Sequence, residues 1–297
     1  MTEPAGRSPA THFVAVLIPE PEKWLSDITY YGPMLQGLSD GLLERGFYMR
    51  AVDCLHEYQR ERFLGARSEL YAGAVFLGPA YAFEAFIREV VRRVHGPKVL
   101  LDHHIEGLEV HSVREDAEAG MRMVAEHLLA LGHRRLAYLD LDDPNANPWK
   151  RRGISLALAG AGLGELDSGR VAGCRYNFLD VSKALDWFMA LDPRPTAVLC
   201  CDDLRALLLL QAAAERGLRV PQDLSITGFG DNAVRTGRSR ILTSVNVDPT
   251  LMGRKAAELI AAGAAAKPLA VLMPPELTVR GTTAPAQPGN GAPAPGR

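Results

Sequence analysis

Three aspartates stand just beyond apolar segments of the kind that form buried strands. They are Asp102 after residues 98–101, Asp202 after residues 196–200 and Asp231 after residues 224–227. Ligands of open α/β sheets bind beyond the carboxyl ends of the strands, and one carboxylate can accept hydrogen bonds from two hydroxyl groups. The pattern therefore indicates binding of a small polyhydroxylated molecule. The alternative for Asp231 is a role in a turn, and Asp203 is expected to cap or begin the next helix.

The residues that could support catalysis or hold a metal do not form a recognisable set. Three histidines lie in segment 102–111, but they lack the i,i+4 spacing of a helical metal motif, and a solvated loop explains them. Gly160, Gly162 and Gly164 follow a helical pattern and not a strand, so they do not match a dinucleotide-binding turn. No P-loop, nucleophile elbow or catalytic triad is found. We therefore expect no enzyme activity, no metal and no cofactor.

Short apolar runs alternate with amphipathic helical patterns along most of the chain. The runs are continuously apolar, which is typical of parallel strands covered on both faces. The expected strands are Phe13–Ile18, Phe47–Val52, Ala74–Leu77, Lys98–Leu101, Leu136–Leu139, Thr196–Cys200 and Leu224–Thr227. Helical patterns cover 116–131, 203–216 and 249–262, and a fourth helix follows Asp180 as its expected N-cap. Strands alternating with helices predict an α/β fold built from right-handed βαβ units.

Two lobes are expected. The polar stretch Asp102–Val113 interrupts the alternation near the midpoint, where we expect the chain to cross from one lobe to the other. The expected N-terminal lobe contains residues 13–109 and about 246–272, and the C-terminal lobe contains 110–245 and about 273–283, with a final strand at Glu276–Val279. The ends, 1–12 and 284–297, are polar or rich in Ala, Pro and Gly, and we expect them to be disordered.

Composition restricts the class of protein. The 297 residues include 33 basic and 35 acidic side chains, a formal charge of −2, so the basic surplus typical of a DNA-binding domain is missing. The four cysteines show no C-x-x-C spacing, which fits a reducing compartment. Neither a secretory signal nor an apolar stretch of membrane-spanning length is found. We expect a cytoplasmic protein that does not associate with membranes.

A series of phrases, in order from about residue 113 to 283, resembles the effector-binding domain of the lactose/galactose repressor (LacI/GalR) family. The strongest is Glu215-Arg-Gly-Leu-Arg-Val-Pro-Gln-Asp-Leu-Ser-Ile-Thr-Gly-Phe-Gly-Asp231. Others are Leu131-Gly-His-Arg-Arg-Leu-Ala137, Leu242-Thr-Ser-Val-Asn-Val-Asp-Pro249 and Pro275-Glu-Leu-Thr-Val-Arg280. The resemblance implies a periplasmic-binding-protein-like type I fold, in which two doubly wound parallel-sheet lobes are joined by crossover hinges.

The same resemblance implies a function. Members of the family sense a small effector, often a sugar, as part of a LacI-type transcriptional regulator whose lobes close over the ligand. The family forms homodimers, and here the helix around Tyr31–Arg45 would contribute to the interface. The helix-turn-helix of the family does not precede the strand at Phe13, so we expect DNA to be bound only through a module not present in this chain.

The resemblance also implies ligand contacts. The family has an arginine that clasps ligand hydroxyls where this chain has Lys150, with Arg151 beside it. Aromatic side chains that would pack against a sugar ring are Trp24, Tyr30 and Tyr31 after the first strand and Tyr176 after the strand near Val171. Packing within a loop is the alternative for each of these aromatics.

The chain departs from the family at four positions that bear on the ligand. Asp202 replaces a frequent asparagine, Gly230 an aspartate, Ala117 an asparagine and Lys150 the arginine, and lysine lacks the planar fork of arginine. These departures leave the identity of the ligand open.

Two other functions fit the same fold. A solute-binding protein of a sugar transporter would be exported and would need a signal peptide, and a stand-alone small-molecule sensor would need no DNA-binding module. An α/β enzyme would need a reactive set of residues that the sequence does not offer.

Overall fold

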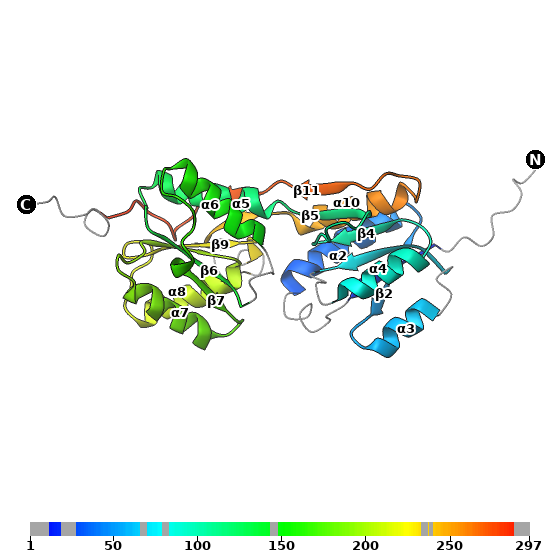
Figure 1. Cartoon of the computed structure of the whole chain (residues 1–297), viewed down its shortest axis with the longest axis horizontal. Helices are drawn as coiled ribbons and strands as arrows, with labels where there is room; N and C mark the ends of the chain where they lie inside the picture. Colours follow the sequence, from blue (N-terminus) through cyan, green and yellow to red (C-terminus); the bar gives the residue numbers. More distant parts are fainter. Residues whose placement is uncertain are drawn as a thin grey trace, which may run out of the picture. The chain divides into compact units, whose positions relative to one another are not determined.

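The computed structural model describes residues 12–18, 28–65, 70–78, 83–142, 148–232, 237 and 240–287. These residues form two compact units (Figure 1). The first takes in the described parts of Met1–Glu115 and Asp248–Met273, and the second those of Asp116–Val247 and Pro274–Arg297. The chain therefore passes from one unit to the other three times. No helix in the described ranges has both the length and the apolar character needed to cross a lipid bilayer.

The first unit contains a sheet in which every pair of neighbouring strands is parallel. Its strands are β1 (Phe13–Ile18), β2 (Tyr48–Asp53), β3 (Tyr71–Leu77), β4 (Lys98–Leu101), β5 (His111–Glu115) and β11 (Ala270–Met273), arranged in the order β11-β5-β4-β3-β1-β2. Its inner strands β1 and β3 are largely buried because helices cover both faces of the sheet.

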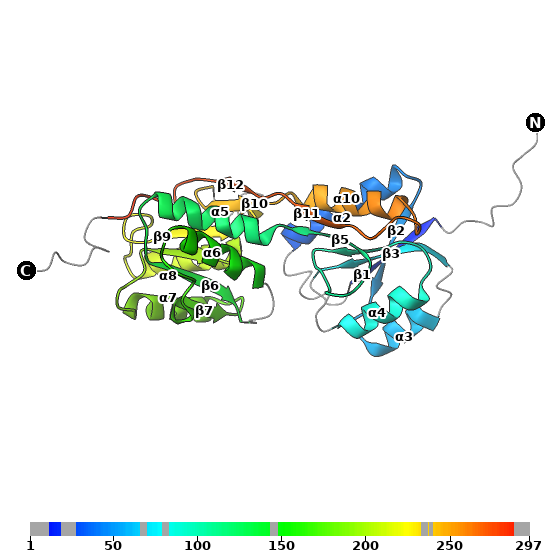
Figure 2. The ribbon, with the colours of Figure 1, turned by 45° about the horizontal axis from the view of Figure 1, so that its top comes forward.

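Two pairs of helices cover the first sheet. Helices α2 (Ile28–Leu43) and α10 (Pro249–Ala261) lie side by side on one face, and α3 (Glu57–Gly65) and α4 (Glu84–Arg93) lie on the other (Figure 2). Helix α10 begins at Pro249, where a missing backbone N–H costs nothing, and Asp248 caps it by accepting hydrogen bonds from the backbone of Thr250 and Leu251. A segment remote in sequence thus completes the first unit.

The second unit contains a sheet of the same kind with one reversed edge. Its strands are β6 (Leu136–Leu141), β7 (Val171–Cys174), β8 (Ala197–Cys200), β9 (Ser225–Phe229), β10 (Thr243–Asn246) and β12 (Glu276–Thr278), arranged in the order β12-β10-β9-β8-β6-β7. All neighbours are parallel except β12, which runs antiparallel to β10.

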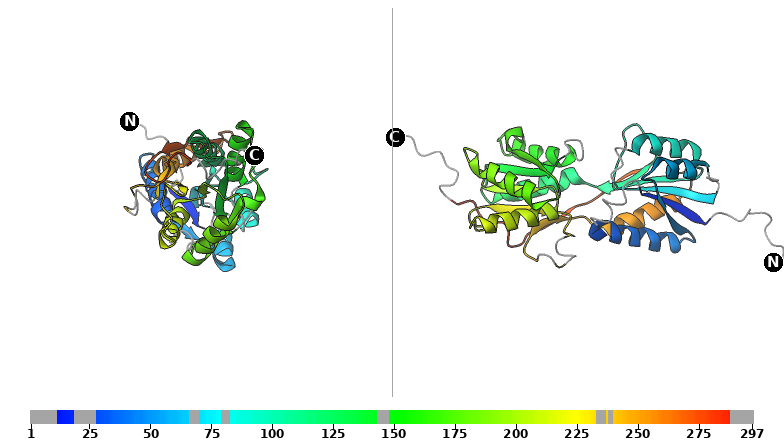
Figure 3. Two further views of the ribbon diagram at one scale, coloured as in Figure 1. Left: turned by 90° about the vertical axis from the view of Figure 1, so that its left-hand side faces the viewer. Right: turned by 90° about the horizontal axis from the view of Figure 1, so that it is seen from below.

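Helices α5 (Ala117–Ala130) and α6 (Pro148–Gly160) pack together on one face of this sheet, and α7 (Phe178–Ala190) and α8 (Asp203–Glu215) on the other (Figure 3). A short 3-10 turn, η3 (Ser168–Arg170), precedes β7. Helix α5 is capped by Asp116, which accepts a hydrogen bond from the backbone N–H of Ala119, and it buries Met121 and Leu128 among other apolar side chains. The predicted two-lobed α/β fold with doubly wound parallel sheets is confirmed.

Several expected elements differ in detail. The stretch Asp102–Val113 does not cross between units, because His111–Glu115 form β5 between β4 and β11 of the first sheet. The crossing instead follows Glu115. Strands β5, β10 and β11 were not expected. Strands β5 and β10 mix polar with apolar residues, and β11 pairs with β5, which is remote in sequence. Helix α7 is capped by Asn177, and the expected cap, Asp180, lies in its first turn and donates its backbone N–H to Asn177.

Candidate functional site

Eight of the nine predicted ligand-binding residues are described, and all eight lie beyond the carboxyl ends of parallel strands. Asp102 follows β4, Tyr176 follows β7, Asp202 follows β8 and Asp231 follows β9, while Tyr30 and Tyr31 lie in the first turn of α2 and Lys150 and Arg151 in the first turn of α6. Trp24, the ninth, lies outside the described residues. Each unit's sheet therefore presents polar and aromatic side chains at its carboxyl edge, where open α/β sheets bind ligands.

In the first unit, two tyrosines converge on one carboxylate. The Tyr30 hydroxyl donates to Asp102 Oδ1 at 2.7 Å and the Tyr31 hydroxyl to Asp102 Oδ2 at 3.2 Å, and the two rings meet edge to face at 5.1 Å. Asp102 has a φ of 73°, a left-handed backbone that aspartate tolerates better than most residues. Burial and the adjacent Asp102 charge raise the pKa of Tyr30 well above its ordinary value, so this phenol stays protonated and remains a donor.

In the second unit, Asp202 caps helix α8. Its Oδ1 accepts the backbone N–H of Arg205 at 2.8 Å, and its Oδ2 accepts hydrogen bonds from the Arg205 guanidinium and, at 3.1 Å, from the Tyr176 hydroxyl. Of the two roles expected for Asp203, the structure shows the second, because the residue lies buried in the first turn of α8.

The Arg205 side chain is buried although it carries a charge. Its Nε and Nη2 donate to the carbonyl of Cys174 at 3.3 and 2.8 Å, and its guanidinium lies 3.9 Å from the centre of the Tyr176 ring. Burial lowers the pKa of this guanidinium, but the neighbouring acidic groups, Asp202 foremost, together more than offset that effect, so the net shift is upward. Arg205 therefore remains charged and is paired with Asp202.

Lys150 and Arg151 bind protein groups in different ways. The Lys150 ammonium donates to the carbonyl of Cys201 at 2.9 Å and lies 3.8 Å from the centre of the Phe229 ring. Lys150 is thus held beside the loop that carries Asp202.

Arg151 Nε donates to Asp140 Oδ2 at 2.6 Å. Asp140 is buried at the end of β6, where it also accepts the Tyr138 hydroxyl and the backbone N–H of Leu141. Arg151 is thus ion-paired with a buried carboxylate at the end of β6.

Asp231 forms a bidentate ion pair with Arg280. The two Asp231 oxygens accept from Arg280 Nη1 and Nη2 at 2.7 and 2.9 Å, an arrangement stronger than a single neutral hydrogen bond. Gly230 before it has a φ of 111°, and Asp231 itself a φ of 51°, so the turn after β9 is left-handed at two successive residues. Arg280, which follows β12, anchors the Asp231 carboxylate at the edge of the sheet.

A buried serine connects the Asp231 turn to helix α8. Ser244 Oγ donates to Asp203 Oδ1 at 2.5 Å and accepts the backbone N–H of Asp231 at 3.2 Å. A Cβ on Gly228 would lie 2.2 Å from Asp203 Oδ1, so glycine is needed there to admit the carboxylate. The Asp202–Asp203 pair and the Asp231 turn therefore belong to one connected set of side chains.

Five polar residues that bind the predicted site residues or lie beside them were not predicted as site residues: Asp140, Asp203, Arg205, Ser244 and Arg280. Asp140 follows the rule that identified Asp202, because it too lies at the end of an apolar run, yet it falls one residue inside β6. Arg280 could not be found by spacing, because it lies 49 residues after Asp231 and only the folded sheet brings the two together. Arg205 pairs locally with Asp202 three residues before it, whereas its contacts with Cys174 and Tyr176 depend on the fold.

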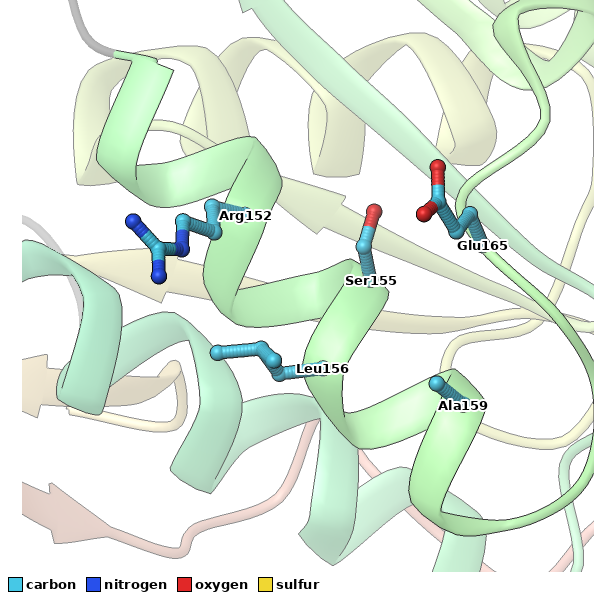
Figure 4. Close-up of a pocket in the computed structure, with 5 residues that line it drawn as sticks. All are labelled: Arg152, Ser155, Leu156, Ala159 and Glu165. Atoms are coloured by element: carbon cyan, nitrogen blue, oxygen red, sulfur yellow. The ribbon is translucent and has the colours of Figure 1, made fainter.

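A pocket on the outer side of α6 is distinct from this set. Arg152, Ser155, Leu156 and Ala159 project from one face of the helix, and Glu165 from the segment that follows it (Figure 4). None of the predicted ligand-binding residues lines this pocket.

Comparison with known proteins identifies the family. The model of the periplasmic binding protein-like domain family matches residues 125–283. The chain belongs to this family. The periplasmic binding protein-like chain is 27% identical over 266 residues to the HTH-type transcriptional repressor CytR of Escherichia coli strain K12, covering 86% of this chain and 75% of that protein. It is 26% identical over 278 residues to the HTH-type transcriptional regulator CelR of Thermobifida fusca, covering 91% and 81%.

Solved structures agree with the sequence relatives. A complex of the transcriptional regulator CelR with cellobiose superposes with a TM-score of 0.79 at 25% identity, covering 92% of this chain and 84% of that one. A LacI-family regulator from Enterococcus faecium with bound ribose shares the fold, with a TM-score of 0.75 at 20% identity and coverage of 93% and 100%. The resemblance to the effector-binding domain of LacI-family regulators is confirmed, and the relatives are transcriptional regulators rather than enzymes.

Proposed function

We propose that this periplasmic binding protein-like domain senses a small polar effector, a carbohydrate or carbohydrate derivative, for a LacI-type transcriptional regulator. The observation that carries the proposal is the set of carboxylates and the aromatic ring at the carboxyl edge of the second sheet, formed by Asp202, Asp231 and Tyr176. Similarity to the cellobiose complex of CelR supports a sugar as the class of ligand.

Asp231 is the carboxylate best placed to accept ligand hydroxyls. Arg280 donates one hydrogen bond to each Asp231 oxygen, whereas a carboxylate offers about four acceptor sites. Its ion pair also keeps Asp231 in one orientation before the ligand arrives, which lowers the entropic cost of binding.

Tyr176 supplies the apolar part of the proposed site. Tyr176 is 53% exposed, and its hydroxyl donates a hydrogen bond to Asp202. Much of the ring is therefore available for contact with a ligand. The C–H face of a sugar ring packs well against an aromatic ring of this kind. In the first unit, Tyr30, Tyr31 and Asp102 are the proposed ligand contacts.

The regulatory context is also part of the proposal. As in its relatives, the domain would act in the cytoplasm as a homodimer and would affect DNA through a separate module. Ligand binding would favour one conformation over another, which is how a sensor domain transmits a signal.

A thermal-shift screen with cellobiose, ribose, gluconate and adenosine tests the proposal. A compound that binds the native state raises the melting temperature by mass action. Asp231→Asn should weaken binding of the best compound by about tenfold to a hundredfold, because a hydrogen bond to a charged group contributes about 1.5–3 kcal/mol.

Asp223→Asn is the matched control, because Asp223 is also ion-paired with an arginine, Arg219, but lies before β9 and not after it. It should bind the compound as the wild type does. The proposal is wrong if none of the four compounds shifts the melting temperature, or if Asp231→Asn binds as tightly as Asp223→Asn.

A further inference from the structure

Arg205 is unusual because a charged side chain is buried at this position of α8. The residue is 1% exposed and lies beside the apolar cluster that contains Cys174, Ala206 and Leu209. A buried charge costs free energy unless it is paired, and apolar replacements of buried ion pairs are often as stable. Packing alone therefore does not account for an arginine at this point of α8.

The polar contacts of the Arg205 side chain are all with groups at the carboxyl edge of the sheet. Its Nη1 is bound to Asp202 Oδ2, and its Nε and Nη2 are bound to the carbonyl at the end of β7. This double attachment gives the planar guanidinium a single orientation.

One face of the Tyr176 ring rests on that guanidinium at 3.9 Å. The same ring is held at its hydroxyl, which donates to Asp202 Oδ2 at 3.1 Å. Because one face is covered and the residue is still 53% exposed, the exposed area belongs mainly to the ring edge and the opposite face. The ring is thus fixed with one face turned outward.

We infer that Arg205 is a positioning residue that fixes the Tyr176 ring as a platform for the apolar face of a cyclic ligand. It acts through Tyr176 and Asp202 and does not touch the ligand. The role in binding rests on the proposed function, whereas the effect on the Tyr176 ring is a property of the ligand-free protein.

The ligand-free test uses NMR of the full chain labelled with ¹³C in the tyrosine rings. The chain has eight tyrosines, so their ring signals can be resolved. The signal that disappears in the Tyr176→Phe variant is assigned to Tyr176. In Arg205→Met, which keeps a long apolar side chain, the Tyr176 signal should move toward that of free tyrosine. Arg205→Lys keeps the charge but not the planar fork, and it should also shift the signal.

Arg216→Met is the matched control, because Arg216 lies at the other end of α8 and is bound through its Nε and Nη2 to Asp186. It should leave the Tyr176 signal in place.

If Arg205→Met does not fold, the double variant Asp202→Asn with Arg205→Met removes both charges of the pair and should fold and show the same shift. An unmoved Tyr176 signal in a folded Arg205→Met or double variant overturns the inference.

Cellobiose affinity supplies the second readout. If cellobiose binds the wild type, Arg205→Met should weaken it at least tenfold, and Arg216→Met should not. Unchanged affinity in an Arg205→Met variant whose Tyr176 signal has moved overturns the platform role. If no compound in the screen binds, the proposed function fails, while the NMR result still decides whether Arg205 positions the ring.

Discussion

Individual polar side chains of this protein are buried where water cannot replace a lost partner. Asp140, Asp203, Arg205 and Lys150 are all nearly inaccessible, and each has a hydrogen-bonding partner supplied by another element. Buried polar groups remain stable only when they are satisfied in this way. These side chains therefore hold defined positions, which suits a site that must recognise a ligand.

His103 is a buried histidine of the first unit that we expect to make stability depend on pH. Burial lowers its pKa from 6.5 to about 4, and its Nδ1 faces the carbonyl of Leu101 at 3.4 Å. Between pH 6.5 and 4 the unfolded state binds the proton more readily than the folded state. The free energy of unfolding should therefore fall by up to about 3 kcal/mol as the pH drops across this window.

Thermal melts of His103→Gln between pH 7 and 4.5 check this expectation. The variant should lose part of the wild type's pH dependence, because it has no group to protonate at this position. His104→Gln alters the exposed neighbouring histidine and should melt with the wild-type dependence. A His103→Gln profile parallel to that of the wild type would contradict the assignment.

At the scale of elements, close helix packing decides where glycine is required. A Cβ on Gly153 of α6 would lie 2.2 Å from the carbonyl oxygen of Glu118 on α5. Gly37 and Gly253 play the same part between α2 and α10, where a Cβ would lie 2.0 Å from a backbone oxygen. Backbone cannot yield as a flexible side chain can, so these helix pairs depend on the missing Cβ atoms.

Gly153→Ala should therefore destabilise the second unit by about 1–3 kcal/mol or more, as overpacking does. Gly160→Ala is the matched control on the same helix, because a Cβ there meets nothing within 4 Å. It should stabilise the protein by about 0.5–1 kcal/mol, since alanine loses less backbone entropy than glycine. Chemical denaturation of both variants measures the difference, and equal effects would show that α5 and α6 can separate at no cost.

At the scale of the whole molecule, remote segments complete each unit. Residues 274–287 belong to the second unit, although most of that unit lies within 116–247. Thr282 is fully buried there: its hydroxyl oxygen accepts the backbone N–H of Thr243, and its carbonyl accepts that of Ile226. The backbone of Ala286 also donates to Leu131, so residues 284–287 of the expected disordered tail make ordered contacts.

Thr282→Val should show that the second unit depends on residues 274–287 for its stability. Valine keeps the shape but leaves the Thr243 N–H without its acceptor, at a cost of about 1–3 kcal/mol. Hydrogen exchange followed by mass spectrometry should show faster exchange in β9 and β10 and no change in the first unit. Thr278→Val, at a partly exposed position of β12, should change little. Equal acceleration in both units would mean that they unfold as one cooperative body.

The sequence by itself determined the fold class, because apolar runs and helical periodicity reflect local burial that any parallel sheet imposes. It also placed Asp102, Tyr176, Asp202 and Asp231 beyond strand ends, since that follows from chain order alone. Short strands such as β5 and β11 could not be predicted, because their pairing joins segments far apart in sequence.

Only the tertiary structure decided which charges meet. Arg205 beneath Tyr176, Arg280 on Asp231 and Ser244 between Asp203 and the Asp231 turn depend on distances across the sheet that no spacing in the sequence encodes. Ion pairs and hydrogen bonds act over a few ångströms, so their partners are selected by the assembled fold.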